Sequence, residues 1–140
     1  MYRILMPVDG SDVALRALDY AVHLVRLIGD AEIHLLNVQP LLPGSVGTFV
    51  GAENVASFLK EESENALAPA RAVLEGERLP VHAAMRVGSA GEEIAGYANE
   101  LPCDVIVMGT RGLGRIGSLV LGSVATQVVH LAEVPVTLIK

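Results

Sequence analysis

The chain has 140 residues, 51% of them hydrophobic and 19% charged, and a formal net charge of -6. This length suits a single domain with one hydrophobic core, which we take to span residues 1-140. The negative charge argues against binding to nucleic acid, because that affinity comes from cations that displace the counterions of phosphates.

A strand is predicted first, over the apolar run "YRILMPV" (2-8), which ends at the turn pair Asp9-Gly10. Ser11 then stands where a helix N-cap is expected, and Asp12 suits the positive end of the helix dipole. Apolar residues recur at helical spacing from there until Gly29. The first strand is therefore followed by a helix over about residues 12-28.

The middle of the chain predicts a strand at 32-38, a loop at 39-52 and a helix at about 55-76. The loop, "QPLLPGSVGTFVGA", is too rich in proline and glycine to form regular structure, and loops of this length usually have a function or are mobile. The helix carries a charged cluster expected to face solvent, made of Lys60, Glu61, Glu62 and Glu64.

The remaining elements alternate in the same way. We predict a strand at 80-87, a helix at 90-101, a buried strand at 104-109, a helix opening at Gly122-Ser123, and a last strand at 134-139. The order βαβαβαβαβ predicts a single doubly wound α/β domain, in which a five-stranded parallel sheet of order 3-2-1-4-5 carries helices on both faces.

Residues 33-52 contain no Asp, Glu, Lys or Arg, but two prolines and three glycines exclude a membrane-spanning helix. The start, "MYRILMPVDGSD", lacks the pattern of a secretory signal. The single cysteine, Cys103, permits no internal disulfide and is expected to be a small core residue. A cytoplasmic location with no membrane contact is the simplest expectation.

The hexamer "GLGRIG" (112-117) has the GxGxxG spacing of dinucleotide-binding proteins. In those proteins the glycines follow the first strand, and an acidic residue ends the second. Here the glycines follow the fourth predicted strand, so the match carries little weight. A P-loop is excluded as well, because no GxxxxGK[ST] occurs and Lys60 and Lys140 are the only lysines.

A longer pattern, G-x2-G-x9-G-S, is more specific, and it consists of Gly109, Gly112, Gly122 and Ser123. Glycines let backbone N-H groups approach phosphate oxygens, and a helix that begins near Ser123 adds its positive dipole end. Residues 105-132 hold Arg111 and Arg115 and no carboxylate. The pattern therefore favours a phosphate site, with a purely loop-shaping role for the glycines as the alternative.

The two ends of the chain, "ILMPVDGSDVALRALDYA" and "DVIVMGTRGLGRIGSLVLGSVATQVVHLAEVPVTLI", resemble the ATP-binding branch of the universal stress protein family. The resemblance implies an adenine nucleotide alpha hydrolase-like fold. It also implies a cofactor site whose adenosine end is lined by Pro7, Val8, Asp9 and Val38 and whose ribose and phosphate path is lined by Met108, Gly109, Arg111, Gly112, Gly122, Ser123 and Val124.

ATP is the nucleotide that the resemblance favours. Many ATP-binding members carry a second hydroxyl residue where this chain has Val124, so AMP and ADP stay as alternatives.

Phosphates repel a carboxylate, so ribose hydroxyls or Mg²⁺ are the expected partners of Asp9. An Asx turn that caps the first helix is an equally good role for Asp9 and does not exclude the others.

The resemblance further implies a homodimer formed through the last strand, Val134 to Ile139, and an unidentified protein partner. Such pairing is physically sensible, because an unpaired apolar edge strand invites aggregation. The partner would read a surface that ATP orders, making the chain a nucleotide-sensing regulator of a stress response.

An enzyme on the same fold, a slow ATP hydrolase or a nucleotidyl transferase, is the first alternative, and a dimeric module that binds no nucleotide is the second. The four histidines, His23, His34, His82 and His130, lie on separate predicted elements without the spacing of metal ligands. Each is expected to be structural, and no catalytic residue or metal ligand is assigned.

Overall fold

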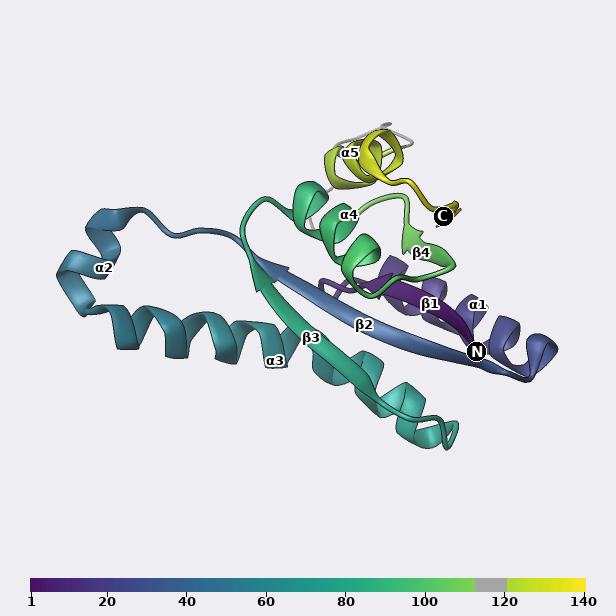
Figure 1. Cartoon of the computed structure of the whole chain (residues 1–140). Helices are drawn as coiled ribbons and strands as arrows, with labels where there is room; N and C mark the ends of the chain where they lie inside the picture. The colour runs from purple at the N-terminus through teal and green to yellow at the C-terminus, as the bar shows by residue number, and fades with distance from the viewer. Residues whose placement is uncertain (113–120) are drawn as a thin grey trace.

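The computed structural model describes residues 1-112 and 121-140, and its sheet has the predicted order, β3-β2-β1-β4-β5, with every neighbouring pair parallel (Figure 1). The strands are β1 (Tyr2–Pro7), β2 (Ala31–Gln39), β3 (His82–Val87), β4 (Val105–Gly109) and β5 (Val136–Ile139). Their bounds differ from the predicted ones by one or two residues.

Both faces of the central strands are buried, as expected for a parallel sheet covered on two sides. On β1, Ile4 and Met6 point to one face and Leu5 to the other, and all three side chains are fully buried. The apolar run that identified this strand is therefore continuous because each of its faces packs against a helical layer.

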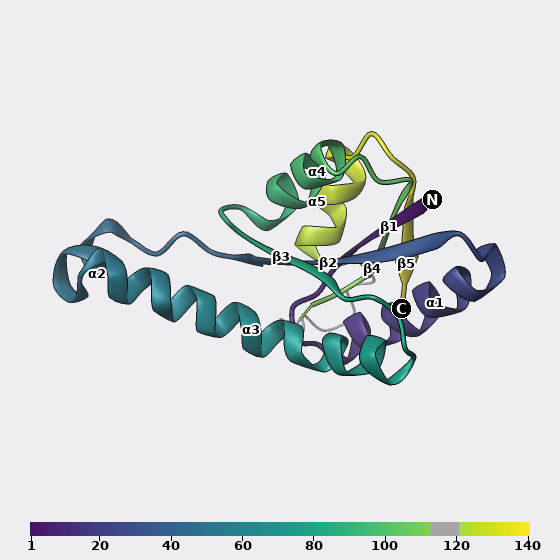
Figure 2. The ribbon, with the colours of Figure 1, turned by 60° about the horizontal axis from the view of Figure 1, so that its bottom comes forward.

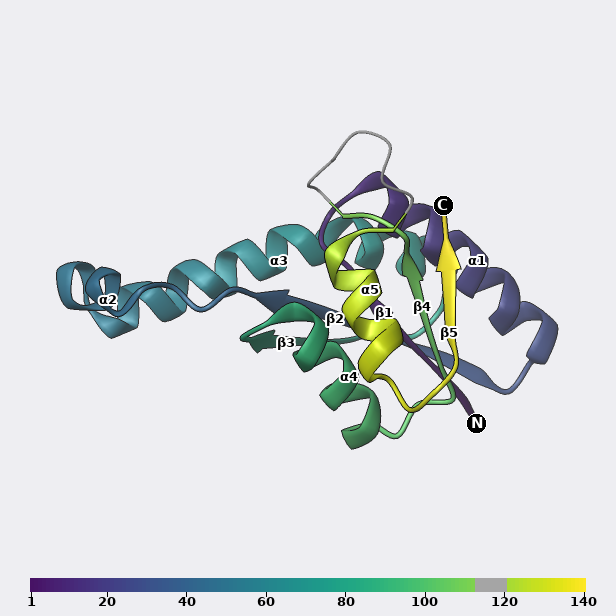
Figure 3. The same cartoon turned by 90° about the horizontal axis from the view of Figure 1, so that it is seen from above.

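Helices cover both faces of the sheet (Figure 2). The first layer consists of α1 (Asp12–Ile28) and α3 (Ala52–Gly76), which pack on the face that carries Ile4. The second consists of α4 (Ala90–Glu100) and α5 (Ser123–Leu131), which pack on the face that carries Leu5. Figure 3 shows α5 in front of β1 and beside β4, with α1 and α3 behind the sheet.

The turn between β1 and α1 forms as the sequence predicts. Ser11 is the N-cap of α1, and its Oγ accepts a hydrogen bond from the Ala14 N-H at 3.3 Å. Asp9 Oδ1 in turn accepts from the Ser11 N-H at 3.0 Å, which is the expected Asx turn. The helix ends at Gly29, whose φ of 84° favours glycine.

The prediction that residues 39-52 form an irregular loop is wrong. They contain a short helix, α2 (Gly44–Val50), which begins after Pro43. Pro43 stands at the N-cap, outside the hydrogen-bonded turns, so its ring and missing N-H do not disturb the helix. Gly51 then adopts φ 89° between α2 and α3, which keeps the two helices separate.

The helix α2 and the first turns of α3 project away from the sheet, and we call residues 40-58 the arm (Figures 1 and 3). No side chain of α2 is buried, and Phe49 is 93% exposed.

Further along α3 the predicted charged cluster is exposed. No helix in the described parts of the chain combines the length and the apolar character that a membrane span requires.

Candidate functional site

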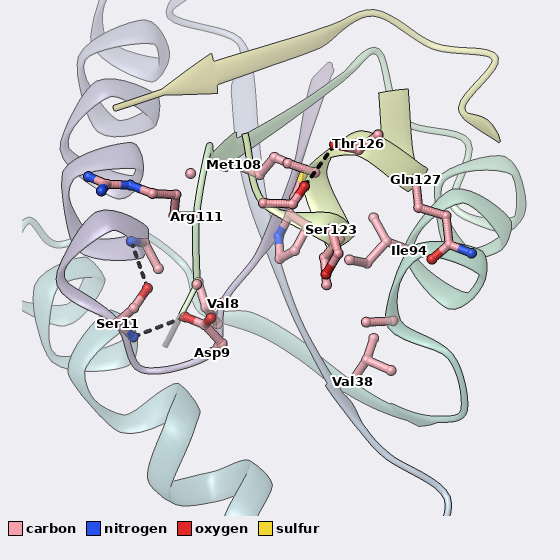
Figure 4. A pocket seen from close by; sticks show the side chains of 18 of the residues that line it. Val8, Asp9, Ser11, Val38, Ile94, Met108, Arg111, Ser123, Thr126 and Gln127 are labelled. Carbon is pink, nitrogen blue, oxygen red and sulfur yellow. Dashed lines mark hydrogen bonds between the residues drawn. The ribbon is translucent and has the colours of Figure 1, made fainter. Parts of the chain in front are cut away.

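A cavity of about 660 Å³ opens at the carboxyl ends of β1 and β4 (Figure 4). These strands are neighbours, yet the chain leaves β1 for α1 on one face and leaves β4 toward α5 on the other. Sheets of this kind bind ligands at such a point, because the diverging connections leave a crevice there.

The cavity brings together every residue that the sequence analysis assigned to the site. These are Pro7, Val8, Asp9, Val38, Met108, Gly109, Arg111, Gly112, Gly122, Ser123 and Val124. Their roles as nucleotide ligands stay predictions. Arg115, Gly114 and Gly117 lie outside the described residues.

One side of the cavity is apolar. Val8 and Val38, at the ends of neighbouring strands, form it together with Ile94 from α4 and Met108 from β4. Figure 4 shows Val38 and Ile94 on the same side, away from Arg111. This side can hold a flat, weakly polar ring.

The opposite side is formed mainly by glycine backbone. A Cβ atom on Gly112 would collide with Asp9 Oδ2, and one on Gly109 would collide with the side chain of Val13. Close packing therefore requires glycine at position 109, whereas at position 112 the side chain of Asp9 would have to move. The loop-shaping role that the sequence left open holds at Gly109 whether or not a ligand is bound.

The N-terminus of α5 borders the cavity without a side-chain cap. Its N-cap is Gly122, which has no side chain to accept the N-H groups of the first turn. Ser123, exposed at the first position of the helix, adds a hydroxyl. The helix α1 also begins at the cavity, but Ser11 caps it. Of these two helix ends, α5 is the one that can offer free donors to an anion.

The cavity holds one acidic and one basic side chain among its described lining residues, Asp9 and Arg111. Asp9 lies between the Ser11 N-H and Gly112. The guanidinium of Arg111 extends away from Ser123 in Figure 4, so it would have to rotate to reach an anion at the start of α5. The arrangement is suited to hold a molecule with an apolar ring at one end and an anion at the other.

The model of the universal stress protein family matches residues 1–140, which is the whole chain. The chain belongs to the universal stress protein family. Universal stress protein MJ0531 of Methanocaldococcus jannaschii is 34% identical over 144 residues, which cover 99% of this chain and 81% of that one.

Several solved structures share the fold. That of MJ0577, also from Methanocaldococcus jannaschii, superimposes with a TM-score of 0.84 at 28% identity and covers 99% of this chain and 95% of its own. That of the universal stress protein from Archaeoglobus fulgidus in complex with dAMP has a TM-score of 0.69 at 26% identity and covers 100% of this chain and 98% of its own.

Several residues that line the cavity of this universal stress protein are not predicted from the sequence, among them Asn37, Thr126 and Gln127. Asn37 is buried, and its Nδ2 donates to the Val8 carbonyl at 2.8 Å, so it fixes the end of β1 beside the cavity. An asparagine inside the apolar strand "HLLNV" was the available signal, because a buried amide must find partners.

The sequence also gave no sign that two histidines of this stress protein meet. His34 on β2 and His82 on β3 lie opposite each other, and both contact Glu32. The hydrogen bond with His34 is the largest cause that lowers the pKa of Glu32. Cys103, by contrast, is a core residue as predicted, and burial raises the pKa of its thiol.

Proposed function

We propose that this universal stress protein binds an adenine nucleotide in the 660 Å³ cavity and acts as a nucleotide-sensing regulator of a stress response. One observation carries the proposal: the cavity joins an apolar side to the uncapped N-terminus of α5. An adenine ring needs the first and a phosphate needs the second. The dAMP complex of the Archaeoglobus fulgidus relative supports the same class of ligand.

In this proposal the base lies against Val8 and Val38, and the phosphates extend toward Gly122 and Ser123. Asp9 stands between these two ends and has Oδ2 outside its Asx turn. That oxygen can accept from ribose hydroxyls or hold Mg²⁺, which usually combines one or two carboxylates with the phosphates of its ligand. ATP is the proposed ligand, with AMP and ADP as alternatives because of Val124.

The described lining favours binding over turnover. Asp9 and Arg111 are its ionisable side chains, and neither stands beside a second group that would make it an acid-base pair. Efficient hydrolysis needs a positioned base or nucleophile. The proposed output is therefore a changed surface for a protein partner. The arm is the proposed surface, since it leaves the sheet at the end of β2, next to Val38.

A thermal-shift series with ATP, ADP, AMP, NAD and FMN, each with Mg²⁺, tests the ligand. A nucleotide at a hundred times its dissociation constant stabilises the fold by about 2.7 kcal/mol, which raises the melting temperature by several degrees. Gly112→Val should abolish the response, because its side chain would fill the phosphate approach and displace Asp9.

Gly96→Val is the matched control, because a Cβ at this position of α4 meets nothing within 4 Å. It should leave the nucleotide response unchanged. A wild-type chain that no adenine nucleotide stabilises would contradict the proposed function. An undiminished response in Gly112→Val would contradict the assignment of the site, and steady ADP production would favour the hydrolase.

We also propose that two copies pair through β5, at the edge of the sheet. The Pro135 and Ile139 carbonyls accept hydrogen bonds from the N-H groups of Ile106 and Thr110, so the backbone N-H of Val136 points to the open side. Val136→Pro removes that N-H, and Val136→Ala keeps it. Sedimentation at micromolar concentration should give a dimer for the wild type and Val136→Ala and a monomer for Val136→Pro. A monomeric wild type would refute the dimer.

A further inference from the structure

Three polar side chains converge at the amino ends of β2 and β3, on the face that carries α4 and α5. Glu32 and His34 are two residues apart on β2, so they project from the same face of the sheet. His82 is the partner of His34 in the β2-β3 register. The two imidazole rings stack with their centroids 4.6 Å apart and their planes inclined by 14°.

The candidate ligand atoms of this cluster lie close together, and one of the two stacked rings must turn for both nitrogens to face the same ion. His34 Nε2 lies 2.8 Å from Glu32 Oε1, and His82 Nε2 lies 3.6 Å from Glu32 Oε2. One nitrogen from each histidine and one carboxylate oxygen all lie within 4.8 Å of one another. Two ligands of a tetrahedral zinc ion, each at about 2.0-2.1 Å, are separated by roughly 3.3 Å. The observed separations bracket that value.

We propose that Glu32, His34 and His82 bind a divalent transition-metal ion, with Zn²⁺ as the best match to two imidazoles and one carboxylate. Such a ligand set leaves a fourth coordination position for water. The side chain of His82 is 43% exposed, which gives the ion a path from solvent. Hard cations such as Mg²⁺ and Ca²⁺ are disfavoured, because they require oxygen ligands.

The neighbouring charged side chains affect which oxygen of the Glu32 carboxylate is available to a metal ion. Arg3 on β1 donates from Nε to Glu32 Oε1 at 3.2 Å, which orients the carboxylate and leaves Oε2 for the ion. The positive charge of the Arg3 guanidinium also repels a metal cation bound at Glu32. Arg86, on the same face of β3, is paired with Glu100 at 2.9 Å and lies over the ring of Tyr97.

This cluster is separate from the cavity at the other end of the sheet. His34 and Val38 are four positions apart on β2, which corresponds to about 13 Å along the strand. The metal proposal therefore does not depend on the proposed nucleotide site.

Calorimetric titration of the untagged full chain with ZnCl₂ at neutral pH tests the proposal. We expect one zinc ion per chain, and binding at least about tenfold weaker in His82→Ala and in His34→Ala. Binding should also weaken toward acidic pH, because the ion competes with protons for both imidazoles. Retained melting behaviour in His82→Ala, whose side chain is partly exposed, shows that the fold is intact.

His23→Ala and His130→Ala are the matched controls, since both side chains are exposed on helices away from the cluster. Both should bind zinc as the wild type does. Absence of zinc binding in the wild type would overturn the proposal, and so would wild-type affinity in the His34→Ala His82→Ala double variant.

Discussion

At the carboxyl ends of β1 and β4 the cavity combines apolar side chains with glycine backbone and a helix N-terminus, whereas at the amino ends of β2 and β3 three polar side chains meet one another. The first region offers N-H donors whose direction the fold itself determines. The second offers nitrogen and oxygen ligands that depend on strand register. One sheet can therefore present an anion site at one end and a cation site at the other.

The largest change in the free energy of unfolding is expected from a substitution in the core that lies between the two regions. Leu5 is fully buried on β1, and Leu5→Ala should lower the free energy of unfolding by about 2-5 kcal/mol. Urea denaturation measures the loss. Leu27→Ala, at a 68% exposed position of α1, is the control and should change stability by less than about 0.5 kcal/mol. Equal losses in both variants would contradict the assigned core.

A second comparison concerns two helices that begin at the carboxyl end of the sheet. Ser11→Ala removes the hydroxyl that caps α1 and should cost about 1 kcal/mol. Ser89 is the N-cap of α4 but makes no side-chain cap hydrogen bond, so Ser89→Ala should change stability by less. Thermal unfolding of the two variants side by side measures the difference, and a larger loss in Ser89→Ala would contradict it.

The cluster at the amino end should add an acid dependence to stability. The hydrogen bond with His34 lowers the pKa of Glu32, so the unfolded chain binds more protons than the folded one at acidic pH. The stabilisation is complete above 4.5, the ordinary pKa of Glu32, and is lost as the pH falls through the lowered folded value.

Glu32→Gln should therefore be less stable than the wild type at neutral pH, and the difference should shrink below pH 4.5. Denaturation at a series of pH values measures this difference, with Glu61→Gln on the exposed face of α3 as the control. A difference that stays constant down to the acid unfolding of the wild type would show that Glu32 contributes no proton linkage.

The smallest effect should be the coupling free energy between zinc binding at one end of the sheet and nucleotide binding at the other. No conformational change is proposed to link them, so the zinc and nucleotide affinities should each be independent of the other ligand. Titrating zinc into the nucleotide-saturated chain measures the coupling free energy, which should be close to zero. A change of tenfold or more would show that the sheet transmits the effect of one ligand to the other site.

The sequence predicts the strands, and the turn and glycine motif that follow β1 and β4, because their signals are local. The apolar runs identify the strands, the turn at Asp9 follows β1, and the glycine motif follows β4. The His34-His82 contact arises only from the register of two strands that α2 and α3 separate in the chain. The proline and glycine content of residues 39-52 does not predict the helix α2, because Pro43 and Gly51 stand at its ends.

The arm has a consequence for how this sequence can vary. Because α2 buries no side chain, substitutions along Gly44–Val50 remove little packing from the core, and insertions there lengthen an exposed segment. Selection for stability therefore constrains the arm far less than it constrains β1 or β4. The arm can diverge quickly in sequence, and any surface that it presents can change while the sheet and both of its ends stay the same.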